Sequence, residues 1–195
     1  MKYQTILLFG APGSGKGTQG KNLGRLPGYL HFACGDAFRS LAPASELGRA
    51  FAQYSSGGGL VPDELTVRLW RQSIDALIAS GKFDPDWDTL LLDGIPRTVK
   101  QARLLDDSIV VNGVIYLVCN NVEEIVGRLR KRAESSGRAD DTDEEVIRHR
   151  MDVYEEVTRP VLELYPRNKI FRVNAVRPVE AVAADLVKVL EGLKK

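Results

Sequence analysis

The segment Gly10–Thr18 combines closely spaced glycines, a lysine and hydroxyl side chains directly after the short apolar run Thr5–Phe9. Glycines let backbone N–H groups converge on phosphate oxygens, the N-terminus of a following helix adds a positive dipole, and Lys16 supplies a mobile charge. So many glycines lower stability unless a bare backbone is needed, which argues against an ordinary glycine-rich turn. The segment therefore predicts a phosphate-binding loop.

Two details of this loop leave alternatives open. Gly15–Gly20 also satisfies the dinucleotide-binding pattern G-x-G-x-x-G, but a dinucleotide site has its first glycine at the strand end, and this match starts well beyond it. Gly17 occupies the place where standard phosphate-binding loops carry a Ser or Thr that binds Mg²⁺, and Thr18 follows one place later. Ligation of Mg²⁺ by Thr18 is therefore an open expectation.

Several arginines are candidates for binding further phosphate oxygens, because the planar guanidinium group donates paired hydrogen bonds. They are Arg39, Arg97, Arg128, Arg132, Arg138 and Arg150. Arg128 and Arg132 lie four residues apart in a helical pattern and so share one face. The alternative is that these arginines are solvated and pair with the acidic residues at 140–145, but the phosphate-binding loop favours phosphate binding.

Asp93 follows the apolar run Thr89–Leu92, where an unpaired carboxylate would be costly. A magnesium ion with its bound water molecules would satisfy this carboxylate, and the alternative is an aspartate that caps a turn. We expect Asp93 to bind Mg²⁺ through water.

The chain around these residues alternates short apolar runs with helical patterns. The expected strands are Thr5–Phe9, Leu30–Ala33, Thr89–Leu92, Val114–Val118 and Ile170–Val173, and the expected helices include Thr98–Leu105, Val122–Ala133, Asp143–Leu164 and Pro178–Leu193. The alternation predicts an α/β fold with a central parallel five-stranded sheet flanked by helices.

Two segments depart from this alternation. The long connection between Ala33 and Leu90 is mainly helical and includes Asp63–Ala79, and Glu134–Gly137 is a polar break between two arginine-rich helices. We expect one domain over residues 1–195, with a core at 1–33, 89–132 and 143–195, a helical part at about 34–88 and a short lid loop at about 133–142.

The composition gives no sign of a macromolecular partner. Lys and Arg number 27 against 26 Asp and Glu, so the net charge of +1 provides no electrostatic reason to expect nucleic acid or an acidic membrane surface. The two cysteines, Cys34 and Cys119, are too few for a four-cysteine zinc site or a disulfide framework. With no export or anchoring segment, we expect a cytoplasmic monomer without structural zinc.

Five segments in order resemble the nucleoside monophosphate kinases, and specifically the adenylate kinases, over residues 6 to about 190. They are Gly10–Thr18, Cys34–Arg39, Gly59–Pro62, Asp93–Arg97 with Ile95 in place of the usual aromatic residue, and the arginine constellation Arg128, Arg132, Arg138–Asp141 and Arg150. Arg150 is matched rather than His149 because Tyr154 follows it at the family's spacing. The resemblance implies a P-loop NTPase fold with a short lid and the reaction MgATP + AMP ⇌ 2 ADP.

The resemblance also implies roles for individual residues. The ATP-binding residues would be Gly13, Ser14, Gly15, Lys16, Gly17, Thr18, Arg128, Arg132 and Arg177. The AMP-binding residues would be Cys34, Arg39, Gly59, Leu60, Val61, Gly94, Arg97, Gln101, Arg138 and Arg150. The catalytic residues would be Lys16, Arg97, Arg132, Arg138 and Arg150. No general base is needed, because an acceptor phosphate is already mostly ionised near neutral pH.

The identity of the acceptor depends on two positions. Gln101 matches a glutamine that adenylate kinases place toward the adenine edge, whereas UMP/CMP kinases typically have asparagine there. Cys34 replaces the threonine of adenylate kinases, and its thiol also fits simple packing at a strand end. A UMP/CMP kinase, or a non-catalytic protein that signals its ATP-bound state to a partner, is the alternative.

Overall fold

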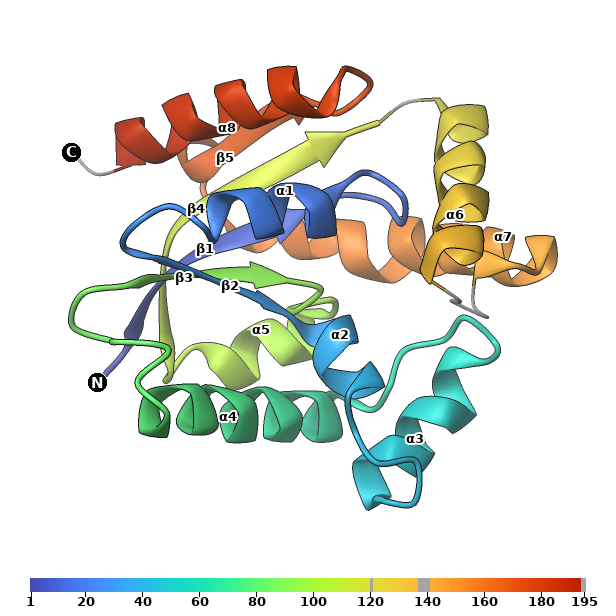
Figure 1. Cartoon of the computed structure of the whole chain (residues 1–195), viewed down its shortest axis with the longest axis horizontal. Helices are drawn as coiled ribbons and strands as arrows, with labels where there is room; N and C mark the ends of the chain where they lie inside the picture. Colours follow the sequence, from blue (N-terminus) through green and yellow to red (C-terminus); the bar gives the residue numbers. More distant parts are fainter. Residues whose placement is uncertain (120, 137–140, 194–195) are drawn as a thin grey trace.

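The structure is a computed structural model that describes residues 1–119, 121–136 and 141–193. Five parallel strands form one sheet in the order β2-β3-β1-β4-β5 (Figure 1). The strands are β1 (Tyr3–Phe9), β2 (Tyr29–Ala33), β3 (Thr89–Asp93), β4 (Ile109–Val118) and β5 (Ile170–Asn174). The predicted α/β fold with a five-stranded parallel sheet is confirmed.

The α-helices of the described residues are α1 (Lys16–Leu23), α2 (Cys34–Arg39), α3 (Glu46–Ser55), α4 (Asp63–Ala79), α5 (Val99–Leu105), α6 (Val122–Ser136), α7 (Glu144–Val153) and α8 (Val179–Leu193). Figure 1 shows α1 and α8 on one side of the sheet and α4 and α5 on the other. Within the described residues, none of these helices is both long and apolar enough to span a bilayer.

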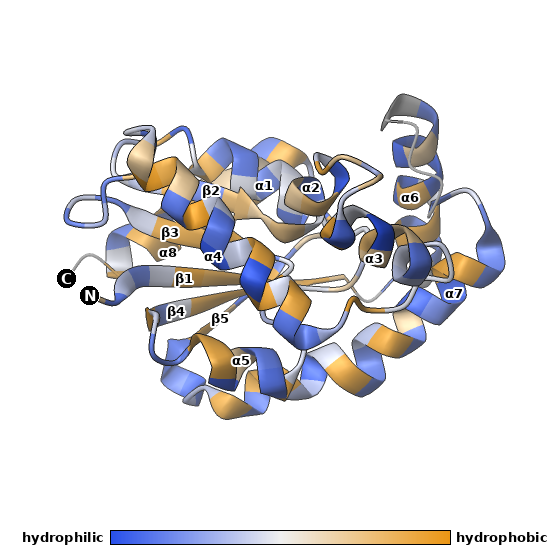
Figure 2. Cartoon of the chain, turned by 90° about the horizontal axis from the view of Figure 1, so that it is seen from below, coloured by the Kyte–Doolittle hydropathy of each residue, from blue (hydrophilic) through white to orange (hydrophobic). Residues whose placement is uncertain are grey.

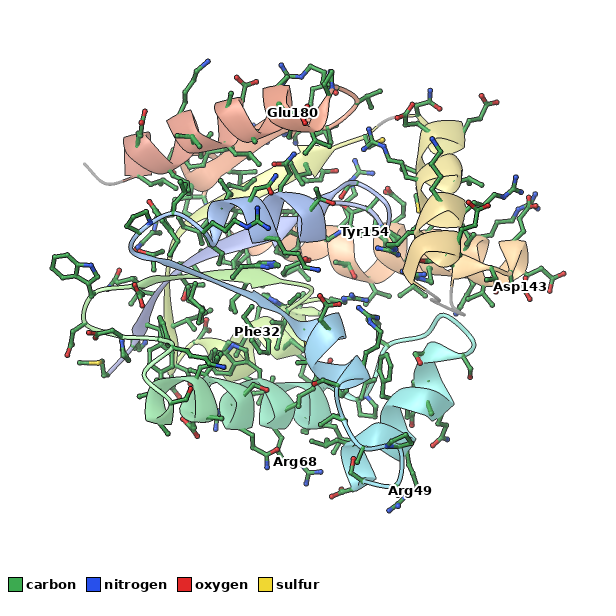
Figure 3. All side chains as sticks on the ribbon, viewed as in Figure 1. Phe32, Arg49, Arg68, Asp143, Tyr154 and Glu180 are labelled. Carbon is green, nitrogen blue, oxygen red and sulfur yellow. The ribbon has the colours of Figure 1, made fainter. Side chains whose placement is uncertain are left out.

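The central strand β1 shows why a continuous apolar run is needed. Successive side chains of a strand point to opposite faces. Ile6 and Leu8 pack with residues of α1 and α8, whereas Leu7 and Phe9 pack with residues of α4 and α5. Figure 3 labels Phe32, which belongs to the second of these two clusters. A strand that is covered on both faces reads as apolar at every position.

The strand β4 begins earlier than predicted, at Ile109 rather than Val114. Its pairing with β1 shifts between Thr5 and Ile6, so that Asn112 is an extra residue opposite the two. Asn and Gly are poor strand formers, which is why Asn112 and Gly113 concealed the first half of the strand.

The helix predicted over Asp143–Leu164 is confirmed in its extent, but its second half is not an α-helix. After α7 the chain makes a wider π-helical turn at Tyr154–Thr158 and then a 3₁₀ segment at Arg159–Leu164. Pro160 contributes to the change, because proline has no N–H to donate to a carbonyl oxygen of the preceding turn; Arg159 before it keeps α-helical backbone angles, with φ −59° and ψ −39°.

The predicted polar break at Glu134–Gly137 is also wrong for its first three residues, because α6 continues to Ser136. Residues 133–136, which the sequence assigned to the start of a lid loop, are therefore helical. Residues 137–140 lie outside the described part of the chain.

The long connection between β2 and β3 is helical as predicted, and we refer to residues 34–88 as the helical arm. It contains α2, α3 and α4, and α4 has the predicted bounds. Figure 2 shows hydrophobic and hydrophilic residues alternating along α4. Its buried residues include Val67, Trp70 and Ile74, which pack against the sheet core and place the arm beside the carboxyl ends of the strands.

Candidate functional site

A cavity of about 670 Å³ opens where β1, β2 and β3 end, and Phe9, Ala33 and Asp93 line it. Clefts at the carboxyl ends of parallel strands are the usual ligand sites of such sheets. Every predicted site residue that the structure describes lines this one cavity. Arg138 lies outside the described residues. The structure therefore brings the predicted residues together, and their individual roles stay predictions.

The phosphate-binding loop forms one wall of the cavity, between the end of β1 and the start of α1. Gly13 has φ +79°, and a Cβ on it would lie 3.1–3.2 Å from atoms of Ile125 and Leu129 in α6. Glycine is needed there both for the backbone conformation and for the close approach of α6. Gly15 also has a positive φ and stands at the N-cap of α1, so the loop delivers the helix N-terminus to the cavity.

Lys16 is folded back onto its own loop. Its Nζ donates to the carbonyl oxygens of Gly10 at 2.6 Å and Ala11 at 2.9 Å. Burial lowers the pKa of Lys16 to about 8; the Asp93 carboxylate opposes this fall, and the charges of Arg97, Arg132 and Arg150 add to it. Lys16 therefore lies close enough to three arginines for their charges to act on it.

A buried carboxylate holds two of these arginines. Asp141 is 0% exposed, and its two oxygens accept hydrogen bonds from Nε and Nη2 of Arg132 at 2.6 and 2.8 Å. Nη1 of Arg150 donates to the same carboxylate at 2.5 Å. Burial alone would raise the pKa of Asp141, but Arg132 and Arg150 outweigh it and keep this pKa below its ordinary value. Asp141 thus joins α6 to α7 through two guanidinium groups.

A small apolar cluster orients α6 and α7. Ile125 and Leu129 of α6 pack with Ile147 of α7 and with Tyr154, which Figure 3 labels. Ile125 and Leu129 are four residues apart and buried, so they mark the face of α6 that packs in this cluster. Arg128 and Arg132, each three residues further along the helix, line the cavity.

The arginines near the carboxyl end of β5 are tethered to the chain. Arg128 donates to the carbonyl oxygen of Ala175 at 2.9 Å and pairs with Glu124 at 3.0 Å. Arg177 pairs with Asp185 at 2.5 Å. Arg128, Ala175 and Arg177 all line the cavity.

The helical arm forms the opposite wall. Arg39 pairs with Asp36 at 2.7 Å. Cys34 is buried, and burial raises the pKa of its thiol to about 12, so the thiol stays protonated. Phe38 and Phe51 stack with ring centroids 5.2 Å apart and add an aromatic surface that the sequence argument did not include.

The turn between β3 and α5 supplies Arg97. The guanidinium Nε donates to the Gly94 carbonyl oxygen at 3.1 Å, and the backbone N–H of Arg97 donates to Oε1 of Gln101 at 2.7 Å. Gln101 is 1% exposed. A side chain predicted to face the acceptor base thus also contacts the turn that carries an arginine.

The contacts of three residues of the site were missed by sequence reasoning. Asp141 entered the sequence argument as a possible partner of solvated arginines and as part of the family's arginine constellation, but its burial between Arg132 and Arg150 was not predicted. His31, which the sequence places only at a strand end, has a buried ring whose Nε2 lies 3.6 Å from Oδ2 of Asp93. Gly58 of the arm meets α7, since a Cβ there would lie 2.9 Å from Cγ of Arg150 and 3.0 Å from the carbonyl oxygen of Val146.

The donors for a metal ion are few. Among the described residues, no group of three or more His, Cys, Asp and Glu side chains is arranged to hold a metal ion. Asp93 lines the cavity close to Gly17, and the other lining carboxylate among the described residues, Asp36, pairs with Arg39. One carboxylate together with phosphate oxygens and water is a donor set that suits Mg²⁺, which retains several water molecules, so Asp93 fits this ion. The side chain of Thr18 is exposed at the cavity.

The fold and the glycine-rich loop with its lysine define a P-loop protein that binds nucleotide phosphates. The family model "Adenylate kinase" matches residues 8–170. The chain is 39% identical over 192 residues to an adenylate kinase of Kocuria rhizophila, covering 95% of this chain and 98% of that protein, and 40% identical over 192 residues to one of Nocardioides sp., covering 95% and 96%. It is 36% identical over 191 residues to adenylate kinase isoenzyme 1 of Cyprinus carpio, covering 97% and 95%. The chain therefore belongs to the adenylate kinase family.

Proposed function

We propose that this protein transfers the γ-phosphoryl group of MgATP to the phosphate of AMP and so forms two molecules of ADP. The observation that carries the proposal is the convergence of Lys16 with Arg97, Arg132 and Arg150 on one cavity, strongly enough for their charges to influence the pKa of Lys16. A site for a single neutral ligand would have no use for four cationic side chains. Two phosphorylated substrates that meet in one cavity need several cationic side chains to neutralise their charge.

In the proposed reaction an oxygen of the acceptor phosphate forms a bond to the γ-phosphorus while the bond to the β,γ-bridging oxygen breaks. The phosphate-binding loop and Lys16 hold the donor phosphates, Arg39 and Arg97 hold the acceptor phosphate, and Arg132 and Arg150 neutralise the charge on the transferred group. The protein needs no residue to remove a proton, because the acceptor oxygen is already ionised. Positioning and charge neutralisation are then the whole of the chemistry.

Asp93 would hold Mg²⁺ through water, and Thr18 is proposed as a further contact. The ion supplies charge neutralisation between the donor phosphates when bound. Asp93 suits this task because its carboxylate is buried at the end of β3 and faces the N-terminal turn of α1, near Gly17.

The substrate is expected to be sealed from water, because ATP held in an open cleft would lose its phosphoryl group by hydrolysis. The lid at about 133–142 and the helical arm are the parts proposed to close. Further proposals are that the protein is a cytoplasmic monomer, binds neither nucleic acid nor membranes, and needs no structural zinc.

The acceptor is proposed to be AMP because Gln101 stands at the cavity with a buried amide, which offers both a donor and an acceptor of hydrogen bonds. The protonated Cys34 thiol gives only a weak hydrogen bond, so it adds little discrimination. A UMP/CMP kinase is the second candidate, because Cys34 departs from the threonine of adenylate kinases.

The test is a coupled assay of ADP or nucleoside diphosphate formation from MgATP with AMP, CMP, UMP or GMP. AMP should give the highest kcat/KM. Equal or higher efficiency with CMP or UMP would place the protein with the second candidate. Tight ATP binding without transfer to any of the four acceptors would support a non-catalytic ATP-dependent switch instead.

A further inference from the structure

Gln101 makes a hydrogen bond that recognition of an acceptor base does not require. Its Oε1 accepts the backbone N–H of Arg97 at 2.7 Å, and the residue is 1% exposed. A backbone N–H in such a place needs a partner, because an unpaired buried donor is costly. The amide of Gln101 therefore has a structural partner on the side of the phosphate-binding arginine.

The local sequence explains this contact. Thr98 is the N-cap of α5, and its Oγ1 accepts the backbone N–H of Gln101 at 2.9 Å. In a capping box the side chain three residues after the cap returns a bond to the backbone N–H of the cap itself. Thr98 and Gln101 have the residue types of a capping box, but the returned bond goes one residue further back, to Arg97.

The shifted bond acts on a residue whose side chain faces the cavity. The guanidinium Nε of Arg97 donates to the Gly94 carbonyl oxygen at 3.1 Å, so the side chain curls back over its own turn. The backbone of Arg97 and its guanidinium are thus each held by one hydrogen bond, the first from Gln101 and the second from Gly94. Losing the hydrogen bond to Gln101 would leave the backbone of Arg97, and therefore the origin of its side chain, less fixed.

We propose that Gln101 is a positioning residue for Arg97, in addition to facing the acceptor base. The inference rests on the proposed function in one respect, because it takes Arg97 to hold the acceptor phosphate. One side chain then links the place of the base to the place of the phosphate. An acceptor with any base should depend on Gln101 for the rate of transfer, whereas only AMP should depend on it for base recognition.

Three variants separate the two roles. Gln101→Ala removes both, and Gln101→Glu keeps an oxygen for the Arg97 N–H but cannot donate to a base. Thr98→Ala removes the neighbouring cap and the hydrogen bond from Thr98 to Asp63 of α4, while leaving the Gln101–Arg97 bond. We expect Gln101→Ala to lower kcat about tenfold with both AMP and CMP, the size of one lost hydrogen bond to a positioned group. Gln101→Glu should recover kcat but keep a raised KM for AMP. Thr98→Ala should leave kcat within about twofold of wild type.

A rise in KM for AMP alone in Gln101→Ala, with kcat unchanged for both acceptors, would overturn the proposal and leave Gln101 as a base contact only. An equal fall in kcat in Thr98→Ala would also overturn the proposal, because it would point to fraying of α5. A failure of Gln101→Glu to recover kcat would overturn it as well.

Hydrogen exchange of the Arg97 amide, measured by NMR on the substrate-free protein, provides a second readout. Exchange should be faster than wild type in Gln101→Ala and close to wild type in Gln101→Glu; unchanged exchange in Gln101→Ala would contradict the proposal. This readout does not depend on turnover. If the wild-type protein accepted no nucleoside monophosphate, the proposed function would fail while the exchange result still decided whether Gln101 positions Arg97.

Discussion

The phosphate-binding loop takes its binding groups from one contiguous stretch of backbone. The three arginines whose charges act on Lys16, namely Arg97, Arg132 and Arg150, come from three separate parts of the chain. The loop is held by glycines and by Lys16, which bonds to the loop's own carbonyl oxygens. Arg132 and Arg150 depend on Asp141, whose carboxylate joins α6 to α7. Local geometry is sufficient for the first region, and the second needs the packing of α6 on α7.

This difference indicates a division of labour. A rigid loop made of backbone can bind ATP before the reaction begins. A cluster of arginines, held by a carboxylate between two helices, is suited to stabilise charge that develops during transfer. Changes in the loop should therefore affect both ATP binding and the rate, and changes in the cluster mainly the rate.

The largest effect is expected in the loop. Lys16→Met should lower kcat about 10³-fold, because a fixed charge on the transferring group contributes several kcal/mol to the transition state. Because burial already disfavours the charged form of Lys16, the melting temperature should not fall. Turnover by the folded variant close to that of wild type would contradict the role given to the loop lysine.

In the arginine cluster, Asp141→Asn should cost about 2–3 kcal/mol of unfolding free energy and lower kcat about 10²-fold, because it leaves two guanidinium groups without their shared carboxylate. Chemical denaturation and steady-state kinetics measure both. Glu155→Gln, which breaks the exposed pair of Glu155 and Arg159, is the matched control and should change neither. Equal behaviour of the two variants would show that Asp141 is an ordinary surface acid.

The pH dependence of ATP binding tests the loop in another way. With its pKa lowered to about 8, Lys16 loses its charge as the pH rises through that value, so ATP affinity should fall about tenfold between pH 7 and pH 9. Calorimetric titration of the substrate-free protein measures this. Lys16→Met, which binds weakly at every pH, should show a flat profile over the same interval, and a flat wild-type profile would count against the lowered pKa.

The smallest effect is expected where the arm meets α7. Gly58→Ala should raise KM for AMP about three- to tenfold, because its Cβ would press on Arg150 and on the backbone of Val146 and keep the arm from closing. Gly81→Ala is the matched control, since Gly81 also has a positive φ but no atom within 4 Å of the added Cβ. Backbone strain should lower the free energy of unfolding of both variants. An equal change in KM for AMP in the two variants would therefore contradict a role of Gly58 in closing of the arm.

The same difference between local and long-range interactions explains how much of the structure could be predicted from the sequence. The five strands, the loop at Gly10–Thr18 and the helix Asp63–Ala79 are local features with a strong residue pattern, and the structure has them. The buried state of Asp141, the contact of His31 with Asp93 and the bond from Arg97 to Gln101 depend on elements that meet only in the folded chain. The family resemblance grouped Arg132, Asp141 and Arg150 in one constellation, but it did not predict which of these side chains pair.

Errors in the predicted elements have a similar origin. Pro160 sits inside an otherwise good apolar pattern, and periodicity alone did not reveal the π-helical turn before it. The bulge at Asn112 hid half of β4 because one polar residue and one glycine interrupted the apolar run. In both places a single residue altered hydrogen bonding that the pattern of apolar positions does not record.

The division of labour is tested most directly by Arg150→Lys, which keeps the charge but loses the planar fork. The measurement is the single-turnover rate of phosphoryl transfer alongside the equilibrium Kd for ATP in the same variant. We predict a rate about 10²-fold below wild type with an ATP Kd within about threefold of it. A variant whose ATP affinity falls as far as its rate would contradict the account, because the arginine cluster would then bind the ground state as strongly as the transition state.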